Sequence, residues 1–365
     1  MIVRELSAKL EALDQEIISL LWAWHRFEKR TDGPSIVDFG LTPPHKIKRI
    51  SDRLDLLRRI EKTLSNSEDR LSRDRLLAHA AYVRCLMGEQ RTFEEYIAVT
   101  QGLPVHYFST EYLEQCQERL KVSLSLLGVK WGQDIKKALL SKDTLIPKKL
   151  LPRHFRKRLS AVLPRLSDYL GLNVECPVTF QFVEVDEYWG YWVDGNWRRF
   201  RMRFNHIDKG LGESECEQFL YHELLAHCCQ LSVWRHKIKD GLIRKLCGTT
   251  TVHTPEQFIF EGLAQTLPPF FQANKLEKEG LFAARVRLSH LAGLVLNNIH
   301  VMINSGGTIE ECITYGGRRL PTITEGRIVS ECVSRSVNSL FRSYQYVYNP
   351  VLNNLFRPVF HSPTH

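Results

Sequence analysis

The chain of 365 residues carries 43% hydrophobic and 25% charged residues, and its formal net charge is +9. These shares match ordinary globular proteins, so they exclude a disordered or fibrous chain, and the length suffices for one large domain or two ordinary ones. The positive charge comes with no recognisable nucleic-acid-binding motif, so we expect no nucleic-acid partner.

No apolar run approaches the roughly 18 residues of a membrane span. The first residues, Met1 to Glu5, lack the basic region and apolar core of a secretory signal. The nine cysteines are an odd number without CxxC pairs, which is typical of a reducing compartment rather than of a disulfide scaffold. We therefore expect a cytoplasmic protein with no membrane partner, and the sequence leaves its oligomeric state open.

The N-terminal part of the chain has the pattern of a helical region. Apolar residues recur at spacings of three and four in residues 10–27, 50–64 and 71–87, which predicts three helices. Thr92 followed by Glu95 is a capping box, which predicts the start of a further helix. We expect residues 1–170 to form an N-terminal helical region.

Basic residues are densest between Lys148 and Arg158. Two interpretations of this segment are open. It is either a solvated helix face or a surface that contacts an acidic partner.

The composition changes between Val178 and Asn205. Apolar or aromatic residues alternate with polar ones on either side of the turn-forming sequence Asp194-Gly195-Asn196. This alternation around a turn predicts an antiparallel β-hairpin over residues 178–205.

Helical periodicity then returns and continues to the end of the chain. Three helix starts are marked by capping residues, namely Ser214 with Glu217, Thr254 with Pro255 and Gln257, and Thr308 with Glu311. They predict helices over 214–231 and 255–271 and further C-terminal helices. The expected fold is mainly α, with a small antiparallel β-hairpin or sheet before helix 214–231 and a second region over residues 171–365.

Helix 214–231 contains the sequence His222-Glu223-Leu-Leu-Ala-His227, an HExxxH motif. Zinc sites in hydrolases use two neutral imidazoles, a third oxygen ligand and an open position for water. A glutamate directly after the first histidine can take a proton from that water. We therefore expect His222 and His227 to be metal ligands and Glu223 to be the general base.

The spacing of this motif makes a structural demand. Residues five apart on an α-helix are offset by about 140°, too far for both imidazoles to reach one ion. Ala226 stands where the second histidine of HExxH would stand. The helix must therefore end or carry a π-bulge between Glu223 and His227.

A third ligand is expected from the separate helix 255–271. Glu261 lies 34 residues beyond His227 in an apolar stretch beside Gly262 and Ala264. A buried carboxylate needs a compensating partner, and a metal ion supplies one. Gln265, one turn later, is expected to contact the ligands. Thiolate ligation by Cys228 or Cys229 is the alternative, but adjacent helical residues point about 100° apart.

These motifs resemble a known group of enzymes. His222-Glu223, His227 and the sequence Glu261-Gly262-x-Ala264 resemble helical gluzincin-type zinc metallopeptidases of unknown-function domain families, whose first motif is usually HExxPGHH. The HExxxH spacing with EGLA is similar to the tubulin-tyrosine carboxypeptidase family. Looser similarities extend over residues 74–89, the hairpin ending at Asn205, and residues 341–348.

The resemblance implies a helical metallopeptidase-like fold in which residues 171–365 form the catalytic region. It implies zinc on His222, His227 and Glu261. It also implies that Arg342, Tyr344 or Tyr348 stabilises the oxyanion formed during peptide hydrolysis. His236 and His253 are lesser candidates for such contacts.

Three functions remain open at this point. The favoured one is a zinc-dependent peptidase that acts on a peptide or protein substrate. A carboxypeptidase and an acidic substrate are the options that we consider within it. The second is a metal-dependent hydrolase of an amide or ester in a small metabolite. The third is a non-catalytic helical binding protein that uses the basic segment 148–158.

Overall fold

The computed structural model describes residues 2–28, 36–132, 134–186, 189–271 and 280–348. Most of the described residues are helical and a minority form strands, which confirms the mainly α class. The chain divides into two compact units. Unit 1 comprises Met1–Gln90, Pro152–Lys209 and Glu223–Gln257, and unit 2 comprises Arg91–Leu151, Gly210–His222 and Phe258–His365. Each unit uses three separate segments, whereas the division expected near residue 170 is contiguous.

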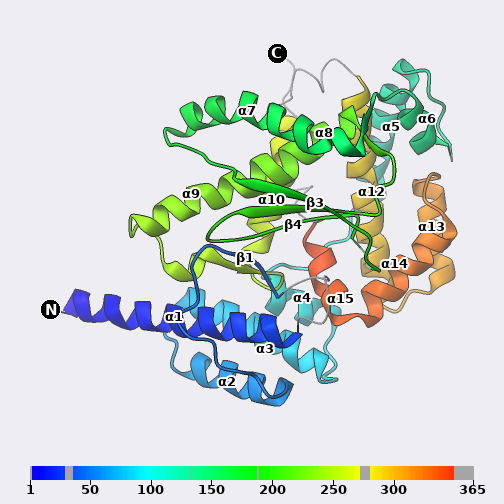
Figure 1. Cartoon of the computed structure of the whole chain (residues 1–365). Helices are drawn as coiled ribbons and strands as arrows, with labels where there is room; N and C mark the ends of the chain where they lie inside the picture. Colours follow the sequence, from blue (N-terminus) through cyan, green and yellow to red (C-terminus); the bar gives the residue numbers. More distant parts are fainter. Residues whose placement is uncertain (1, 29–35, 133, 187–188, 272–279, 349–365) are drawn as a thin grey trace, which may run out of the picture. The chain divides into compact units, whose positions relative to one another are not determined.

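The first helices of unit 1 follow the predicted periodicity. They are α1 (Ile2–Glu28), α2 (Arg53–Ser65) and α3 (Arg70–Leu86), and they pack beside one another (Figure 1). Asp52 and Asp69 accept the N-terminal backbone N–H bonds of α2 and α3, which satisfies donors that the helix leaves open. Trp24 of α1 is fully buried against Tyr82 of α3.

A five-stranded sheet lies in the same unit, with the order β3-β5-β4-β1-β7. Its strands are β1 (Val37–Gly40), β3 (Val178–Val183), β4 (Tyr191–Asn196), β5 (Phe200–Asn205) and β7 (Thr249–Thr251). The sheet is mixed, because β3 pairs with β5 in parallel and β4 pairs with β5 antiparallel. The predicted antiparallel hairpin is present as β4 and β5, and the sheet that contains it is mixed.

The hairpin exists, but its first strand is not the one predicted. Asp194, Gly195 and Asn196 belong to β4, and the turn lies after them. The Asn196 side chain accepts hydrogen bonds from the backbone N–H groups of Arg198 and Arg199, and this Asx turn replaces the predicted one. β5 is an inner strand, paired on both sides, so it has no free edge for an extended substrate.

Two further helices of unit 1 follow. They are α7 (Leu151–Leu170) and α9 (Cys228–Lys239), with a short 3₁₀ turn, η3 (Lys245–Gly248). Phe155 of α7 stacks on Phe180 and Phe204 of the sheet. The buried Asp194 accepts hydrogen bonds from Arg201 and Arg203, so its charge is compensated within the sheet.

Unit 2 is helical apart from the short two-stranded sheet of β2 (Leu145–Pro147) and β6 (Gly210–Gly212). Its helices are α4 (Phe93–Gln101), α5 (Thr110–Leu126), α6 (Ile135–Ser141), α8 (Glu213–Phe219), α10 (Gln257–Phe271), α12 (Leu281–Asn304), α13 (Ile309–Arg319), α14 (Glu325–Val337) and α15 (Ser339–Val347), with the 3₁₀ turn η1 (Lys148–Leu150). α12 supplies Leu291, Leu294 and Val295 to the main core, and α13 and α14 pack against it (Figure 1).

The predicted helix starts had mixed outcomes. The capping boxes at Thr92 and Thr308 are present. The one at Ser214 is not: Ser214 donates to the carboxylate of Asp143, 2.5 Å away, and the N-cap of α8 is Gly212. The α10 helix begins at Gln257, two residues later than predicted.

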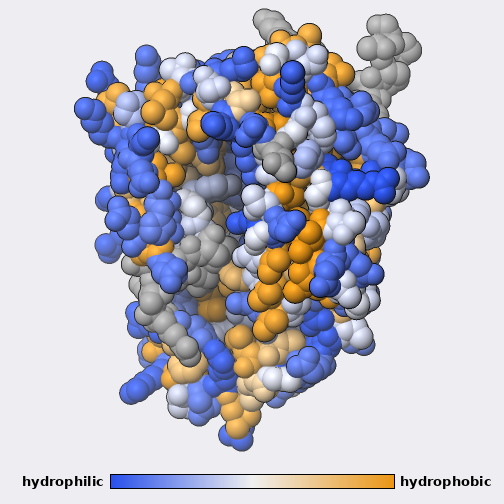
Figure 2. Space-filling view, turned by 90° about the vertical axis from the view of Figure 1, so that its right-hand side faces the viewer, coloured by the Kyte–Doolittle hydropathy of each residue, from blue (hydrophilic) through white to orange (hydrophobic). Residues whose placement is uncertain are grey.

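The face shown in Figure 2 carries many hydrophilic side chains, with apolar side chains gathered on parts of it. The exposed apolar side chains of the described residues are distributed over several helices, and they include Val122, Leu126 and Val337. No helix among the described residues is both long and apolar enough to span a membrane.

Candidate metal centre

The HExxxH motif lies on a stretch of π-helix. α8 passes into the π-helical segment η2 (Leu220–His227), and α9 continues from Cys228. A π-helix bonds residue i to residue i+5, so residues five apart come to lie near one face. The π-helix therefore brings both histidines toward one face, as their five-residue spacing requires. It extends over the whole segment Leu220–His227 rather than being a single bulge.

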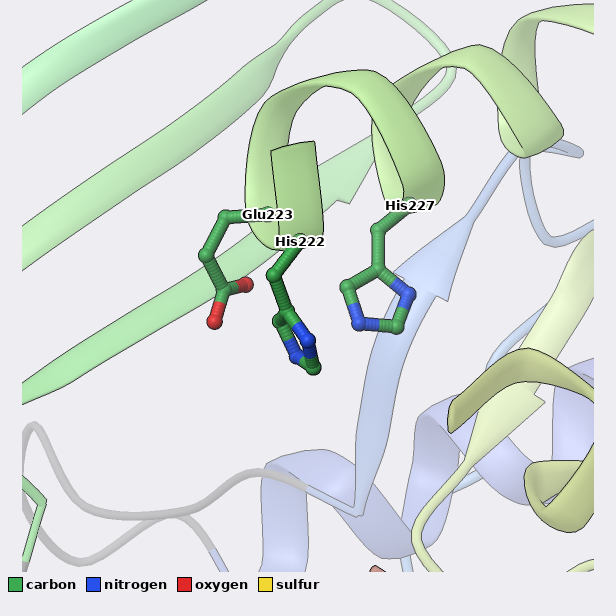
Figure 3. A group of neighbouring side chains, drawn as sticks. All are labelled: His222, Glu223 and His227. Atoms are coloured by element: carbon green, nitrogen blue, oxygen red, sulfur yellow. The ribbon is translucent and has the colours of Figure 1, made fainter. Parts of the chain in front are cut away.

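His222, Glu223 and His227 bring their ligand atoms together. One ligand atom from each residue lies within 4.8 Å of the other two. Figure 3 shows both imidazole rings projecting from the same side of the segment, with the Glu223 carboxylate beside the His222 ring. Imidazoles and carboxylates are groups that bind zinc. Among the described residues, the group that converges contains Glu223, the predicted base, and does not contain Glu261, the predicted third ligand.

The group is shielded from solvent, and this shifts its proton affinities. Glu223 is 7% exposed and His227 is 9% exposed. Burial lowers the pKa of His222 to about 4, against a smaller opposing effect of a hydrogen bond with the Ala264 backbone. Burial raises the pKa of Glu223 to about 8. His222 is therefore neutral near pH 7, which is the state that binds metals.

Glu261 lies beside His222. Its Oε2 atom is 3.6 Å from His222 Nε2, and its side chain is 6% exposed. Because His222 is neutral near pH 7, this contact is not an ion pair but an approach of a carboxylate to an imidazole. Two ligand atoms of one tetrahedral zinc ion lie about 3.4 Å apart. The separation of His222 and Glu261 therefore suits two ligands of the same ion.

The Ala264 backbone is a feature of this site that sequence reasoning missed. The His222 ring forms a hydrogen bond with it. Metal-binding histidines commonly donate their second ring N–H to such a carbonyl, which fixes the ring orientation. Every residue has a backbone carbonyl, so the residue types alone do not predict which carbonyl contacts His222. Gln265, the predicted supporting residue, is half-buried on α10.

The predicted oxyanion residues lie at the C-terminal end of the described chain. Arg342 of α15 donates to Asn304 Oδ1 at 2.8 Å and to the Arg91 carbonyl at 3.0 Å. Tyr348 donates to the Tyr344 hydroxyl at 2.5 Å. These contacts fasten α15 within unit 2, and the oxyanion role of the three residues stays a prediction.

The alternative ligands have other environments. Cys228 and Cys229 are buried, and burial raises the pKa of both thiols, which disfavours the thiolate that a metal needs. The His236 ring contacts the Ser232 carbonyl at 2.9 Å, one turn back on α9. His253 is 1% exposed and its ring lies 3.8 Å from the ring of Tyr82.

Comparison with known proteins finds a similar fold but gives no information about chemistry. No protein-family model and no curated protein matches the chain. A solved structure with a similar fold is the "putative lipoprotein from Colwellia psychrerythraea", with a TM-score of 0.55 and 12% sequence identity. The match covers 84% of this chain and 56% of that one, so the chain spans little more than half the length of that protein. At this identity, the likeness establishes a similar fold and nothing more.

Proposed function

We propose that the protein is a zinc-dependent hydrolase, and in the first instance a peptidase of the gluzincin type. The observation that carries the proposal is the π-helical segment, which brings His222, Glu223 and His227 together despite their five-residue histidine spacing. π-Helical turns are rare and occur frequently at functional sites. Their coincidence with a metal-binding motif supports a metal site.

The residues fit a zinc ion by their chemistry. His222, His227 and Glu261 would supply two nitrogens and one oxygen, which leaves the fourth tetrahedral position for water. His222 Nε2 and the buried Glu261 Oε2 lie 3.6 Å apart, and a bound cation would compensate the charge of the buried carboxylate. When bound, zinc acts as a Lewis acid that lowers the pKa of its water toward neutrality.

The side chains of the protein would then move the proton. Glu223 accepts a proton from the attacking water on its carboxylate and gives it to the leaving amine. Its metal-free pKa of about 8 shows how strongly burial favours the protonated form. A neighbouring cation lowers that pKa and restores the carboxylate, so one group can serve as base and then as acid.

An acidic substrate is favoured by one observation in unit 1. Arg153, Arg156 and Lys157 are exposed on the first turns of α7, where the helix has no acidic residue. Positive charge near a helix N-terminus is unfavourable by itself, so an anionic partner would relieve it. We include an acidic peptide or protein as the expected substrate class.

Zinc analysis of the purified full-length chain tests the proposal. We expect one zinc per chain in the wild type and in Glu223→Gln, and no zinc in His222→Ala. Glu223→Gln should lower peptide hydrolysis by about 10³-fold or more, since it removes the base and keeps the ligands. Absence of stoichiometric zinc in the wild type would contradict the proposal and favour a binding protein.

A panel of peptides separates the first two candidate functions. Peptides blocked at the N-terminus, at the C-terminus or at neither end should be tested beside small amides and esters. A carboxypeptidase should reject the C-terminally blocked peptides alone. Turnover of the small amides and esters without turnover of any peptide would assign the chain to the second function, a hydrolase of small metabolites.

A further inference from the structure

The strand β3 lies at one end of the five-stranded sheet, so only one of its two edges pairs with another described strand. That edge pairs with β5 in parallel over the whole of Val178–Val183. The strand at the opposite end, β7, has only three residues, and all three are buried. An unpaired strand edge presents backbone N–H and C=O groups that can bond to a further strand. Of the two end strands, β3 therefore offers the longer and more accessible edge.

The hydrogen bonds with β5 determine which backbone groups of β3 point outward. The His206 N–H donates to the Val183 carbonyl at 3.0 Å, so the backbone groups of Val183 face β5. Successive residues of a regular strand direct their backbone groups to opposite edges. Phe180 and Val178 lie three and five positions before Val183. Their N–H and C=O groups therefore face the edge away from β5.

The beginning of α7 lies beside this strand. The Phe180 ring stacks on the Phe155 ring, with centroids 5.6 Å apart, and the Arg156 guanidinium lies 5.4 Å from the Phe180 centroid. Arg153, Arg156 and Lys157 are exposed. Residues three apart on a helix share a face, so Arg153 lies on the same side of α7 as Arg156. A strand added to β3 would therefore lie beside exposed positive charge.

Acids of the chain do not compensate this charge. Among the described residues, Arg153, Arg156 and Lys157 form no ion pair. The first turn of α7 contains no acidic residue, and the first acid of the helix, Asp168, follows three turns after Arg156. A carboxylate that approaches β3 can therefore form charge-assisted hydrogen bonds with these guanidinium groups without breaking an ion pair.

We propose that the outer edge of β3 binds an extended acidic segment of a partner protein as an added strand. The backbone groups of Val178 and Phe180 bond the segment, and Arg153 and Arg156 pair with its carboxylates. Alternate side chains of an extended segment point to one face, so acids at every second position all face α7. The inference goes beyond the proposed function, because docking along β3 requires no metal ion.

Fluorescence anisotropy with a synthetic peptide tests the docking. The probe is fluorophore-labelled acetyl-(Glu-Val)₄-amide, and the protein is full-length His222→Ala in chelator, so that metal-dependent hydrolysis cannot consume the probe. One control peptide has lysine in place of glutamate. The other has methylated peptide nitrogens, which keep the charge and remove the hydrogen-bond donors. We expect saturable binding of the acidic peptide alone. No binding of that peptide, or equal binding of its methylated form, would overturn the proposal.

Charge-reversal variants of the full-length chain test the role of α7. Arg156→Glu replaces an attraction by a repulsion and should weaken binding of the acidic peptide about tenfold. Arg165→Glu is the matched control at an exposed position further along the same helix, and it should change the affinity less than twofold. Equal weakening by both substitutions would mean that the net charge, and not the position beside β3, controls binding, and it would overturn the proposal.

The strand edge has its own pair of variants. Val178→Pro removes an N–H that faces outward, a change that edge strands tolerate, and it should abolish binding. Val178→Ala keeps the N–H and should bind as before. Circular dichroism of both variants verifies that they are folded. Unchanged binding by folded Val178→Pro would exclude strand addition at this edge.

Amide hydrogen exchange tests the same point without a substitution. In the wild-type chain in chelator, the acidic peptide should slow exchange of the Val178 and Phe180 amides. It should leave Thr179 and Gln181 unchanged, because their backbone groups face β5. A bound peptide that protects neither Val178 nor Phe180 would overturn the proposal. These experiments use metal-free protein, so a failure of the chain to bind zinc would disprove the proposed function and leave the docking proposal unaffected.

Discussion

Two pairs of buried histidines in this chain have different surroundings. His79 and His253 lie in the core of unit 1, each 1% exposed. His79 Nε2 lies 2.8 Å from the Thr251 hydroxyl, and the His79 ring packs edge-on against Trp24. Burial lowers the pKa of both rings, to about 3 for His79. This pair is held by hydroxyl and aromatic neighbours.

The second pair, His222 and His227, shares its neighbourhood with carboxylates. Glu223 lies in the same group of ligand atoms, and Glu261 approaches His222. Within the described parts of the chain, this is the place where three potential metal ligands converge. His222 has a lowered pKa, as His79 and His253 have, so a lowered histidine pKa does not by itself mark a metal site. The nearby acids make the difference.

The largest expected effect is the loss of metal from the second pair. His227→Ala should abolish zinc binding and lower hydrolysis by about 10³-fold, or about 4 kcal/mol of transition-state stabilisation. His236→Ala on the next helix is the matched control and should keep both. Zinc analysis and peptide hydrolysis of the two variants check this. If His227→Ala retained zinc, the second histidine pair would not be the metal site, and the distinction between the two histidine pairs would be wrong.

The next effect concerns Glu223 in metal-free protein. Its folded pKa of about 8 lies above the unfolded value of 4.5, so its stabilising contribution is complete below pH 4.5 and is lost as the pH rises toward 8. Glutamine does not ionise, so Glu223→Gln avoids the loss of stability and should stabilise the metal-free protein by about 3 kcal/mol at pH 7 relative to the wild type. Urea unfolding in chelator at pH 5 and pH 8 measures it. An unchanged pH dependence in the variant would show that the carboxyl is not buried as described.

A smaller effect is expected in the first pair. His79→Ala removes a buried ring and its hydrogen bond with the Thr251 hydroxyl, which should cost about 2 kcal/mol of unfolding free energy. Zinc content should not change. Denaturant unfolding and metal analysis of one preparation give both results. A zinc-depleted but stable variant would mean that His79 belongs to the metal site after all.

The smallest effect per pH unit is a change in acid sensitivity. His222 has a folded pKa of about 4, below its unfolded value of 6.5, so its contribution is present above pH 6.5 and is lost as the pH falls toward 4. In metal-free protein, His222→Asn should reduce the slope of unfolding free energy by about 1 kcal/mol per pH unit between these values. Unfolding curves at several pH values test this, and an identical slope would count against a buried neutral ring.

The sequence was informative where local rules decide the structure. Apolar spacing located α1, α2 and α3, and the capping boxes at Thr92 and Thr308 are as predicted. These features depend on residues within one or two helical turns. The same holds for the π-helical segment, because the five-residue spacing of His222 and His227 leaves few ways to bring both rings to one face.

The errors arose where distant residues compete with local ones. Ser214 contacts Asp143, which lies 71 positions earlier, and so does not cap its helix. The parallel pairing of β3 with β5 joins strands that are not neighbours along the chain, and alternation cannot reveal such a pairing. Local patterns give elements, while side-chain chemistry between elements needs coordinates.

The π-helical segment also affects how this chain can be compared with others. The α-helical HExxH motif and this HExxxH motif differ by one residue, and the π-helical segment Leu220–His227 accommodates the extra residue. A column-by-column alignment without a gap places Ala226 opposite the second ligand histidine and registers a lost site. A gap of one position inside η2 restores the correspondence. Relatives of this protein would therefore be recognised more readily by searches that permit such a gap.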